Sequence, residues 1–203
     1  MIGIVDYNMG NLASVINAFS IMGESVVVES NPKNLNKYDK LILPGVGAFG
    51  DAMEHLQSNG MDSAIKEYTL LDRPLLGICL GMQLLFESSE EFGDTKGLGL
   101  IEGEIVAFDE SKFDHKLKVP HMGWNELFVQ RDTPLFKDLE RDFYLYFVHS
   151  FHTKCDDRYA IGKTHYGYEF TSAVQKDNIY GIQPHPEKSH KNGLKIIENF
   201  VEL

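Results

Sequence analysis

Short apolar runs alternate with amphipathic stretches along the first half of the chain. Continuous apolar or β-branched runs predict strands at 2–5, 25–29, 40–43 and 75–78. Apolar residues at helical spacing predict helices between and after these strands, at 12–22, 49–59 and 82–88. This alternation is typical of a parallel sheet. We therefore expect a doubly wound α/β fold with helices on both faces of the central sheet.

The pattern changes from Gly103 onward, where successive strands are separated by turn residues. The expected strands are 105–108, 124–129, 143–148, 159–164, 172–175 and 180–183. The chain closes on an amphipathic helix whose apolar positions are Leu194, Ile197, Phe200 and Val201. We expect one domain over residues 1–203, in which the second half adds antiparallel strands to a mostly parallel sheet.

Composition and charge exclude several function classes. The chain has 203 residues with 30 acidic and 19 basic side chains, which gives a formal net charge of −11. An acidic surface repels phosphates, so we expect no nucleic-acid partner and no anionic membrane surface. No apolar run approaches the roughly 20 residues of a membrane span, and the N-terminus has no signal-peptide features. Two cysteines far apart, Cys79 and Cys155, favour a reducing compartment, so we expect a cytoplasmic protein.

The sharpest local signal is the sequence Gly77-Ile78-Cys79-Leu80-Gly81. An apolar strand leads into it and a helix is expected after it, which is the setting of a nucleophile elbow with Cys in place of Ser. The glycines allow neighbouring backbone to pass close by, and the N-terminus of the helix favours a thiolate. The alternative is a buried structural cysteine, which is what a lone Cys usually is.

A thiol nucleophile needs a base, and the base needs a group that fixes its tautomer. In the segment Pro184-His185-Pro186-Glu187, extended geometry places His185 and Glu187 on the same face, and the prolines stiffen the backbone. A surface turn with an incidental histidine is the alternative. No histidine pair has metal-ligand spacing and no CxxC motif is present, so we expect neither a metal nor another cofactor.

A glycine-rich turn follows the expected strand at 40–43. Its sequence is Pro44-Gly45-Val46-Gly47, and its backbone N–H groups can face a developing oxyanion. The amide of Leu80, directly after the candidate nucleophile, is a second donor. Strand ends on one edge of a doubly wound sheet meet at one crevice, so the two donors are expected at the same site.

Together these motifs resemble a class I (triad-type) glutamine amidotransferase domain. The matching segments are 6–11, 43–49, 77–85, 120–126, 146–150 and 185–189. The resemblance implies that Cys79 is the nucleophile, His185 the base and Glu187 its orienting group. It implies oxyanion donors at Val46 or Gly47 and at Leu80. The residues that it implies for holding the amino-acid part of L-glutamine are Gln83, Glu91, His149 and Ser150.

The activity that this resemblance implies is acyl transfer from glutamine, which yields glutamate and ammonia. The finer signature is similar to family members that deliver ammonia to a separate cyclase subunit with a (β/α)₈ barrel. Such a heterodimer makes imidazole glycerol phosphate and AICAR in histidine biosynthesis. The residues expected at this partner interface are Tyr7, Asn8, Trp124, Tyr146 and Lys188, with core packing as the alternative for the aromatic ones. Pro184 departs from the family's usual Phe and puts the local sheet pairing in question.

Other functions stay open on the sequence alone. The same module can supply ammonia to a paralogous synthase in amino-sugar or surface-glycan biosynthesis, because both would use the same glutaminase site. A stand-alone hydrolase or peptidase with a cysteine elbow is a second alternative, against which the late His-x-Glu pair and Gln83 argue. A catalytically silent regulatory subunit is a third. It would be expected to lack a triad residue, yet all three are present.

Overall fold

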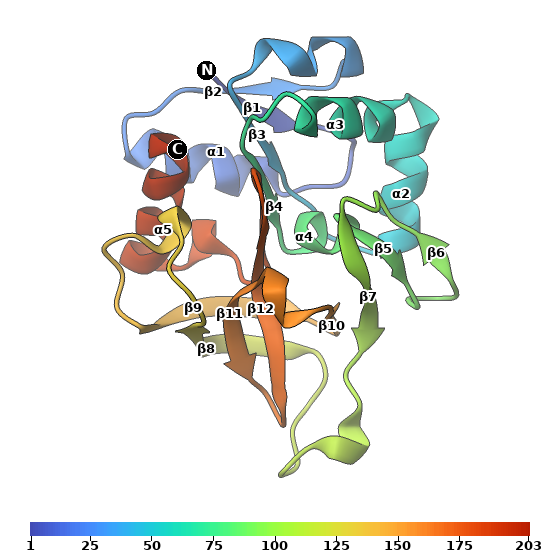
Figure 1. The fold of residues 1–203 in the computed structure, drawn as a ribbon, viewed down its shortest axis with the longest axis vertical. Coiled ribbons are helices and arrows are strands. Elements are labelled where there is room, and N and C mark those ends of the chain that lie inside the picture. Colours follow the sequence, from blue (N-terminus) through green and yellow to red (C-terminus); the bar gives the residue numbers. More distant parts are fainter.

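Five parallel strands form the centre of the fold, which a computed structural model describes over all 203 residues (Figure 1). They lie in the order β2-β1-β3-β4-β13, and every neighbouring pair is parallel. Their bounds are β1 Ile2–Val5, β2 Val26–Glu29, β3 Lys40–Leu43, β4 Leu75–Ile78 and β13 Ile179–Ile182. This arrangement confirms the expected parallel sheet.

Helices cover both faces of this sheet, as Figure 1 shows on either side of β4. One layer contains α1 (Leu12–Ile21) and α5 (His190–Glu202); the other contains α2 (Phe49–Ser58), α3 (Met61–Thr69) and α4 (Leu80–Leu84). Strand β3 connects the two cores. Leu41 and Leu43 pack in the core beneath α2 and α3, and Ile42 packs in the core beneath α1 and α5. Alternate residues of a strand point to opposite faces, so a run that is apolar throughout fits a sheet buried on both sides.

The second half of the chain extends the sheet with mainly antiparallel strands. Beyond β13 the order continues β12-β10-β7-β5-β6, while β11 pairs with β12 and leads to β8 and β9. The bounds are β5 Phe86–Ser89, β6 Thr95–Lys96, β7 Ile101–Ala107, β8 His121–Val129, β9 Asp142–His149, β10 Phe151–Lys154, β11 Ala160–His165 and β12 Glu169–Lys176. Short 3₁₀ segments occupy Pro32–Lys37, Glu110–Lys112, Pro134–Phe136, Asp157–Tyr159 and Pro186–Lys188.

The helix expected over 82–88 is wrong in its second half. Helix α4 ends at Leu84, and the chain enters β5, which pairs in parallel with β7. The Leu85 carbonyl accepts the amides of Leu100 and Ile101, so sheet pairing overrides the local apolar spacing. Sequence reasoning also missed α3, β6 and β10. Gly60, with φ of 81°, allows the chain to start α3 directly after α2.

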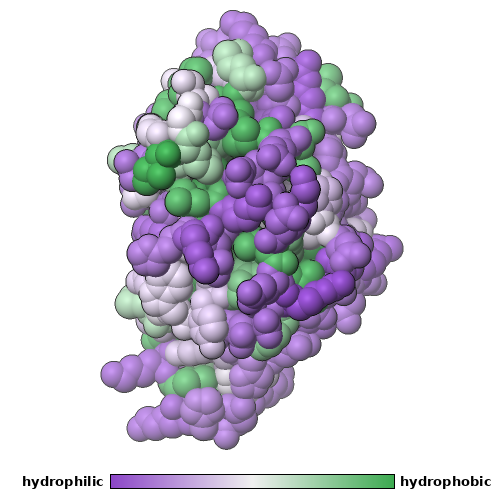
Figure 2. Space-filling view, turned by 90° about the vertical axis from the view of Figure 1, so that its left-hand side faces the viewer, coloured by the Kyte–Doolittle hydropathy of each residue, from purple (hydrophilic) through white to green (hydrophobic).

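No helix of this fold is long and apolar enough to cross a membrane. The face in Figure 2 is mainly hydrophilic, and its apolar residues form small groups separated by polar ones. Single exposed apolar side chains of this kind are normal on folded domains.

Candidate active site

Cys79 occupies a strained turn between β4 and α4. Its φ of 54° and ψ of −114° are rare for a residue with a side chain. The Cys79 amide donates to the Ile182 carbonyl at 2.8 Å, which ties the turn to β13. A Cβ at Gly81 would lie 1.8 Å from the Leu43 carbonyl oxygen, and one at Gly77 would lie 2.6 Å from the Gly81 carbonyl oxygen. Neither position has room for a side chain, so the turn requires both glycines.

His185 and Glu187 form a buried pair just after β13. Nδ1 of His185 lies 2.7 Å from Oε1 of Glu187, and the two side chains are only 4% and 2% exposed. Nε2 of His185 makes no hydrogen bond and is the nitrogen left for Cys79. Burial lowers the pKa of His185, but its interactions with Cys79 and Glu187 outweigh burial and raise the pKa to about 10.

A cavity of about 320 Å³ brings most of the expected site residues together. Cys79 and His185 line it, and Glu187 lies behind His185. The other expected residues on its wall are Val46, Gly47, Leu80, Gln83, Glu91, His149 and Ser150. Pro120, Val148 and Phe151 also line it and were not singled out from the sequence. Pro120 and Val148 lie within the segments that resemble the family, so the sequence contained a signal for these two residues.

The Pro44–Gly47 turn forms one wall of this cavity and is supported from inside the protein. Gly47 has φ of 99°, and Leu80 is the first residue of α4, so its amide has no partner within the helix. Tyr7 donates a hydrogen bond from its phenol to the Pro44 carbonyl at 2.8 Å. Tyr7 is only 2% exposed, so the expectation that its side chain faces a partner needs correction. Its ring packs in the core and supports the turn.

Two glutamine side chains connect the cavity wall to the thiol. Nε2 of Gln83 donates to the Gln183 side-chain oxygen at 2.9 Å and to the Phe151 carbonyl at 3.2 Å. Nε2 of Gln183 donates to Sγ of Cys79 at 3.7 Å. Both N–H bonds of the Gln83 amide are thus used, and its oxygen is left for a ligand. Sequence reasoning missed Gln183, although it directly precedes the Pro184–Glu187 segment.

Pro184 leaves the sheet pairing intact. Strand β13 ends at Ile182, before the proline. The amides on either side remain bonded, from Gln183 to the Ser172 carbonyl and from His185 to the Tyr146 carbonyl, each at 2.8 Å. The missing N–H of Pro184 therefore lies beyond the last paired residue, and no ladder hydrogen bond is lost.

Four of the five residues expected at a partner interface offer at least part of their surface. Asn8 and Lys188 are exposed, and Tyr146 is partly buried. Trp124 is 47% exposed and stacks on His190 with ring centroids 5.1 Å apart. Trp124 also meets the edge of the Tyr146 ring, with centroids 6.1 Å apart.

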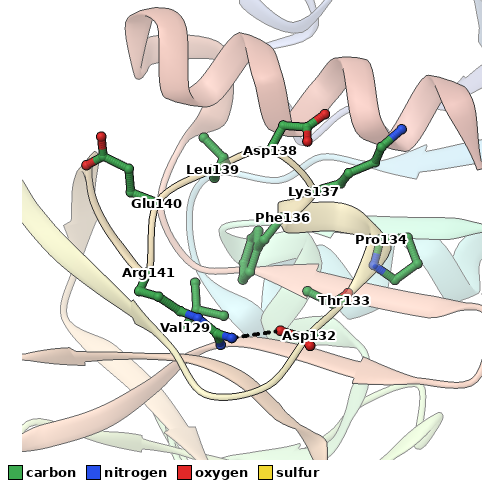
Figure 3. A pocket seen from close by; sticks show the side chains of 10 residues that line it. All are labelled: Val129, Asp132, Thr133, Pro134, Phe136, Lys137, Asp138, Leu139, Glu140 and Arg141. Carbon is green, nitrogen blue, oxygen red and sulfur yellow. Dashed lines mark ion pairs between the residues drawn. The ribbon is translucent and has the colours of Figure 1, made fainter.

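A second cavity, of about 550 Å³, lies at the loop between β8 and β9 (Figure 3). Its lining includes an ion pair between Arg141 and Asp132 at 3.1 Å, but neither a cysteine nor a histidine. The other cysteine, Cys155, lines a third cavity, of about 410 Å³, which contains no histidine, and burial raises the pKa of its thiol to about 11. The cavity of about 320 Å³ is therefore the one in which a cysteine and a histidine meet.

Comparison with known proteins agrees with this geometry. The family model for glutamine amidotransferase class-I matches residues 3–203. The imidazole glycerol phosphate synthase subunit HisH of Sulfurimonas denitrificans is 68% identical over 203 residues, covering 100% of this chain and 98% of that protein. Its counterpart in Wolinella succinogenes is 55% identical, with both chains fully covered. The structure of PurLQS from Thermotoga maritima has a TM-score of 0.78 at 21% identity, covering 99% of this chain and 97% of that one, and shares the fold.

Proposed function

The chain belongs to the class-I glutamine amidotransferase family, and from that premise we propose how its site releases ammonia from glutamine. The chain is a glutaminase. Its function is that of the glutaminase subunit of imidazole glycerol phosphate synthase, because relatives 49–68% identical over its full length are subunits of that enzyme. In the proposed mechanism Cys79 is the nucleophile, His185 the general acid and base, and Glu187 the orienting carboxylate.

The reaction has two halves. The Cys79 thiolate attacks the side-chain amide carbon of glutamine, and Nε2 of His185 gives a proton to the departing ammonia. Water, activated by the same nitrogen, then hydrolyses the γ-glutamyl thioester and releases glutamate. Glu187 keeps the proton of the imidazole on Nδ1, so that Nε2 stays available to the reacting atoms. The amides of Leu80 and of Val46 or Gly47 stabilise the oxyanion.

Charge and hydrogen-bond capacity support an orientation for the substrate. Glu91 is the one acidic side chain on the cavity wall, and Oε2 of Glu91 already accepts the Phe49 amide at 2.7 Å. The α-ammonium group of glutamine needs acceptors, and we assign it to Glu91 and to the free oxygen of Gln83. His149, Ser150 and Phe151 also line the cavity, and Gln83 donates to the Phe151 carbonyl.

The consumer of the ammonia is a cyclase subunit that forms a complex with this chain. We propose that this subunit is a (β/α)₈ barrel in a heterodimer, located in the cytoplasm. The two free cysteines suit such a reducing compartment. We assign Asn8, Trp124, Tyr146 and Lys188 to the contact surface, because each offers accessible side-chain surface.

The observation that supports the mechanism most is the cavity that holds Cys79 and the buried His185–Glu187 pair together. The experiment is a glutaminase assay of the chain alone and in complex with the cyclase subunit, with and without the ribonucleotide ligand of the cyclase. Cys79→Ala should abolish turnover in the complex, and the matched control Cys155→Ala should retain it. A glutamine-analogue diazoketone should label Cys79, as located by mass spectrometry. Label on Cys155, or turnover by Cys79→Ala, would overturn the assignment.

A further inference from the structure

Three side chains, one of which lines the cavity, form a hydrogen-bonded chain that ends on the Phe151 carbonyl. Nδ2 of Asn125 lies 3.1 Å from Nε2 of His121, and Nδ1 of His121 lies 2.9 Å from Nε2 of His149. Nδ1 of His149 lies 2.8 Å from the carbonyl oxygen of Phe151. Because β8 and β9 pair with His121 opposite His149, the two imidazoles meet within the sheet.

The chemistry of the two ends fixes the position of every proton in this chain. A carbonyl oxygen only accepts, so Nδ1 of His149 carries the proton, and Nε2 of the neutral ring accepts. Nδ1 of His121 must then donate, which leaves its Nε2 to accept from the amide of Asn125. Nδ2 of Asn125 also donates to the His165 carbonyl at 2.9 Å, which fixes the orientation of that amide.

Both imidazoles are buried and neutral. His121 is 2% exposed and lies between the rings of Phe147 and Tyr166, at centroid distances of 4.7 and 4.0 Å. Burial lowers the pKa of His121 to about 4 and holds the pKa of His149, 6% exposed, well below its usual value. A proton added to Nε2 of His149 would face the N–H of Nδ1 of His121. A proton added to Nε2 of His121 would face the N–H of the Asn125 amide. Either protonation would set two donors against each other.

The charged groups that act on His149 disfavour an extra proton on its ring, because His121, His152 and His185 each lower its pKa. The other titratable side chains that act on or pack against the two rings are His152, His185 and Tyr166. None of these is anionic at neutral pH. Glu90 raises the pKa of His152, and it is not among the groups that shift the pKa of His121 or of His149.

The Phe151 carbonyl joins this chain to the nucleophile. It accepts from His149 and from Gln83, and Gln83 is bonded through Gln183 to Sγ of Cys79. Neither His121 nor Asn125 lines the cavity, and their side-chain hydrogen bonds reach a cavity residue through His149.

We propose that His121 and Asn125 are positioning residues for the glutaminase reaction, because they hold His149 in its Nδ1–H form. The locked ring fixes the Phe151 carbonyl, which in turn anchors Gln83 on the thiol side of the cavity. In the opposite tautomer, the lone pair on Nδ1 of His149 would face the carbonyl and repel it. This inference rests on the proposed function of the cavity, but its first test is independent of activity.

The first test is ¹⁵N NMR of the full chain with labelled histidine near neutral pH. His121 and His149 should both carry their proton on Nδ1 in the unmodified protein. In His121→Phe, which keeps a ring between Phe147 and Tyr166, Nε2 of His149 loses its donor and only the Phe151 carbonyl still favours the Nδ1–H form, so a fraction of the Nε2–H tautomer should appear. A proton on Nε2 of His149 in the unmodified protein would overturn the proposal, whatever the glutaminase activity.

The second test measures kcat and KM for glutamine in the complex with the cyclase subunit. His121→Phe should lower kcat about three- to tenfold, the effect of one lost buried hydrogen bond, and change KM less. His121→Asn, whose amide can donate from near the place of Nδ1, should recover most of the rate. His152→Phe is the matched control, since His152 is 7% exposed in the same aromatic cluster but bonds Thr153 and Tyr168 instead.

His152→Phe should keep kcat within about twofold of the unmodified enzyme, a change smaller than one hydrogen bond produces. An equal loss in His152→Phe and His121→Phe would show a general packing effect and overturn the positioning role. An unchanged kcat in His121→Phe would also overturn the positioning role. If the unmodified complex had no glutaminase activity, the proposed function would fail, and the NMR result would still decide the tautomers.

Discussion

Oε1 of Glu187 lies 2.7 Å from Nδ1 of His185, and both side chains are almost completely buried. The second carboxylate oxygen of Glu187 has no hydrogen-bond partner, so the carboxylate is hydrogen-bonded to the imidazole alone. The contact fixes the tautomer of His185 and leaves Nε2 for chemistry beside Cys79.

Glu187→Gln should keep the shape of this pair and remove its negative charge. The pKa of His185 should fall from about 10, because one of the interactions that raise it is lost. kcat for glutamine in the complex should fall about 10²- to 10⁴-fold, as is typical when an orienting carboxylate is neutralised. A steady-state assay and an NMR titration of His185 would measure the two effects. A kcat within threefold of the unmodified enzyme, about the effect of a single neutral hydrogen bond, would contradict this role.

Gly81→Ala should destabilise the protein by more than about 3 kcal/mol, because its Cβ would lie 1.8 Å from the Leu43 carbonyl oxygen. Gly50→Ala is the matched control. Gly50 lies in α2, and the atom closest to an added Cβ is Oγ1 of Thr95 at 3.6 Å. That substitution should stabilise the protein by up to about 1 kcal/mol. Urea unfolding of both variants gives the free energies, and similar values for the two would contradict the steric argument.

Acid should destabilise the protein through its buried neutral histidines. The pKa of His121 is about 4 in the folded state and 6.5 without burial, so the unfolded chain binds the proton more readily between these values. The stabilising contribution of this neutral ring is fully present above pH 6.5 and is lost as the pH falls toward about 4. The loss reaches about 3 kcal/mol for this one group.

Urea unfolding near neutral pH and near pH 5 would measure this loss, and His121→Phe should show a shallower pH dependence than the unmodified protein. The contribution of His185 to stability depends on pH with the opposite sign. Its raised pKa stabilises the fold below pH 6.5, and that contribution is lost as the pH rises toward about 10. If the free energy of unfolding fell equally between neutral pH and pH 5 in the unmodified protein and in His121→Phe, His121 would be excluded as the titrating group.

The two cysteines should differ in reactivity toward a small alkylating agent. Cys155 is partly buried, and its pKa is raised to about 11, so little thiolate is present near pH 8. Cys79 is the more buried thiol, but it lines a cavity beside His185, whose imidazole can accept its proton, so it should be modified first. Peptide mapping after partial modification would locate the label, and preferential labelling of Cys155 would contradict this expectation.

The parallel core was predictable because its strands are short and apolar on both faces. β1, β3 and β4 begin and end where the apolar runs do. The elbow was predictable because its glycines leave a recognisable pattern around Cys79, although Gly81 is required by a distant contact, the Leu43 carbonyl. Both features are visible in a few consecutive residues.

Features that depend on pairing between distant strands were not predictable from one sequence. The apolar spacing after Cys79 suggested a helix through 88, but pairing with β7 turned Phe86–Ser89 into a strand. Nothing local to His121 reveals that it lies opposite His149, 28 residues along the chain. The burial of Tyr7 likewise depends on the position of the Pro44 turn, which comes from another strand.

The close approach of Gly81 to the Leu43 carbonyl has a consequence for protein design. The strained backbone of Cys79 is held in place by neighbouring strands, through β13 on one side and the end of β3 on the other. A five-residue elbow grafted onto another scaffold would lack both supports and would relax to an unstrained turn. A transplant that keeps the nucleophile in position must therefore carry β3 and β13 as well as the elbow.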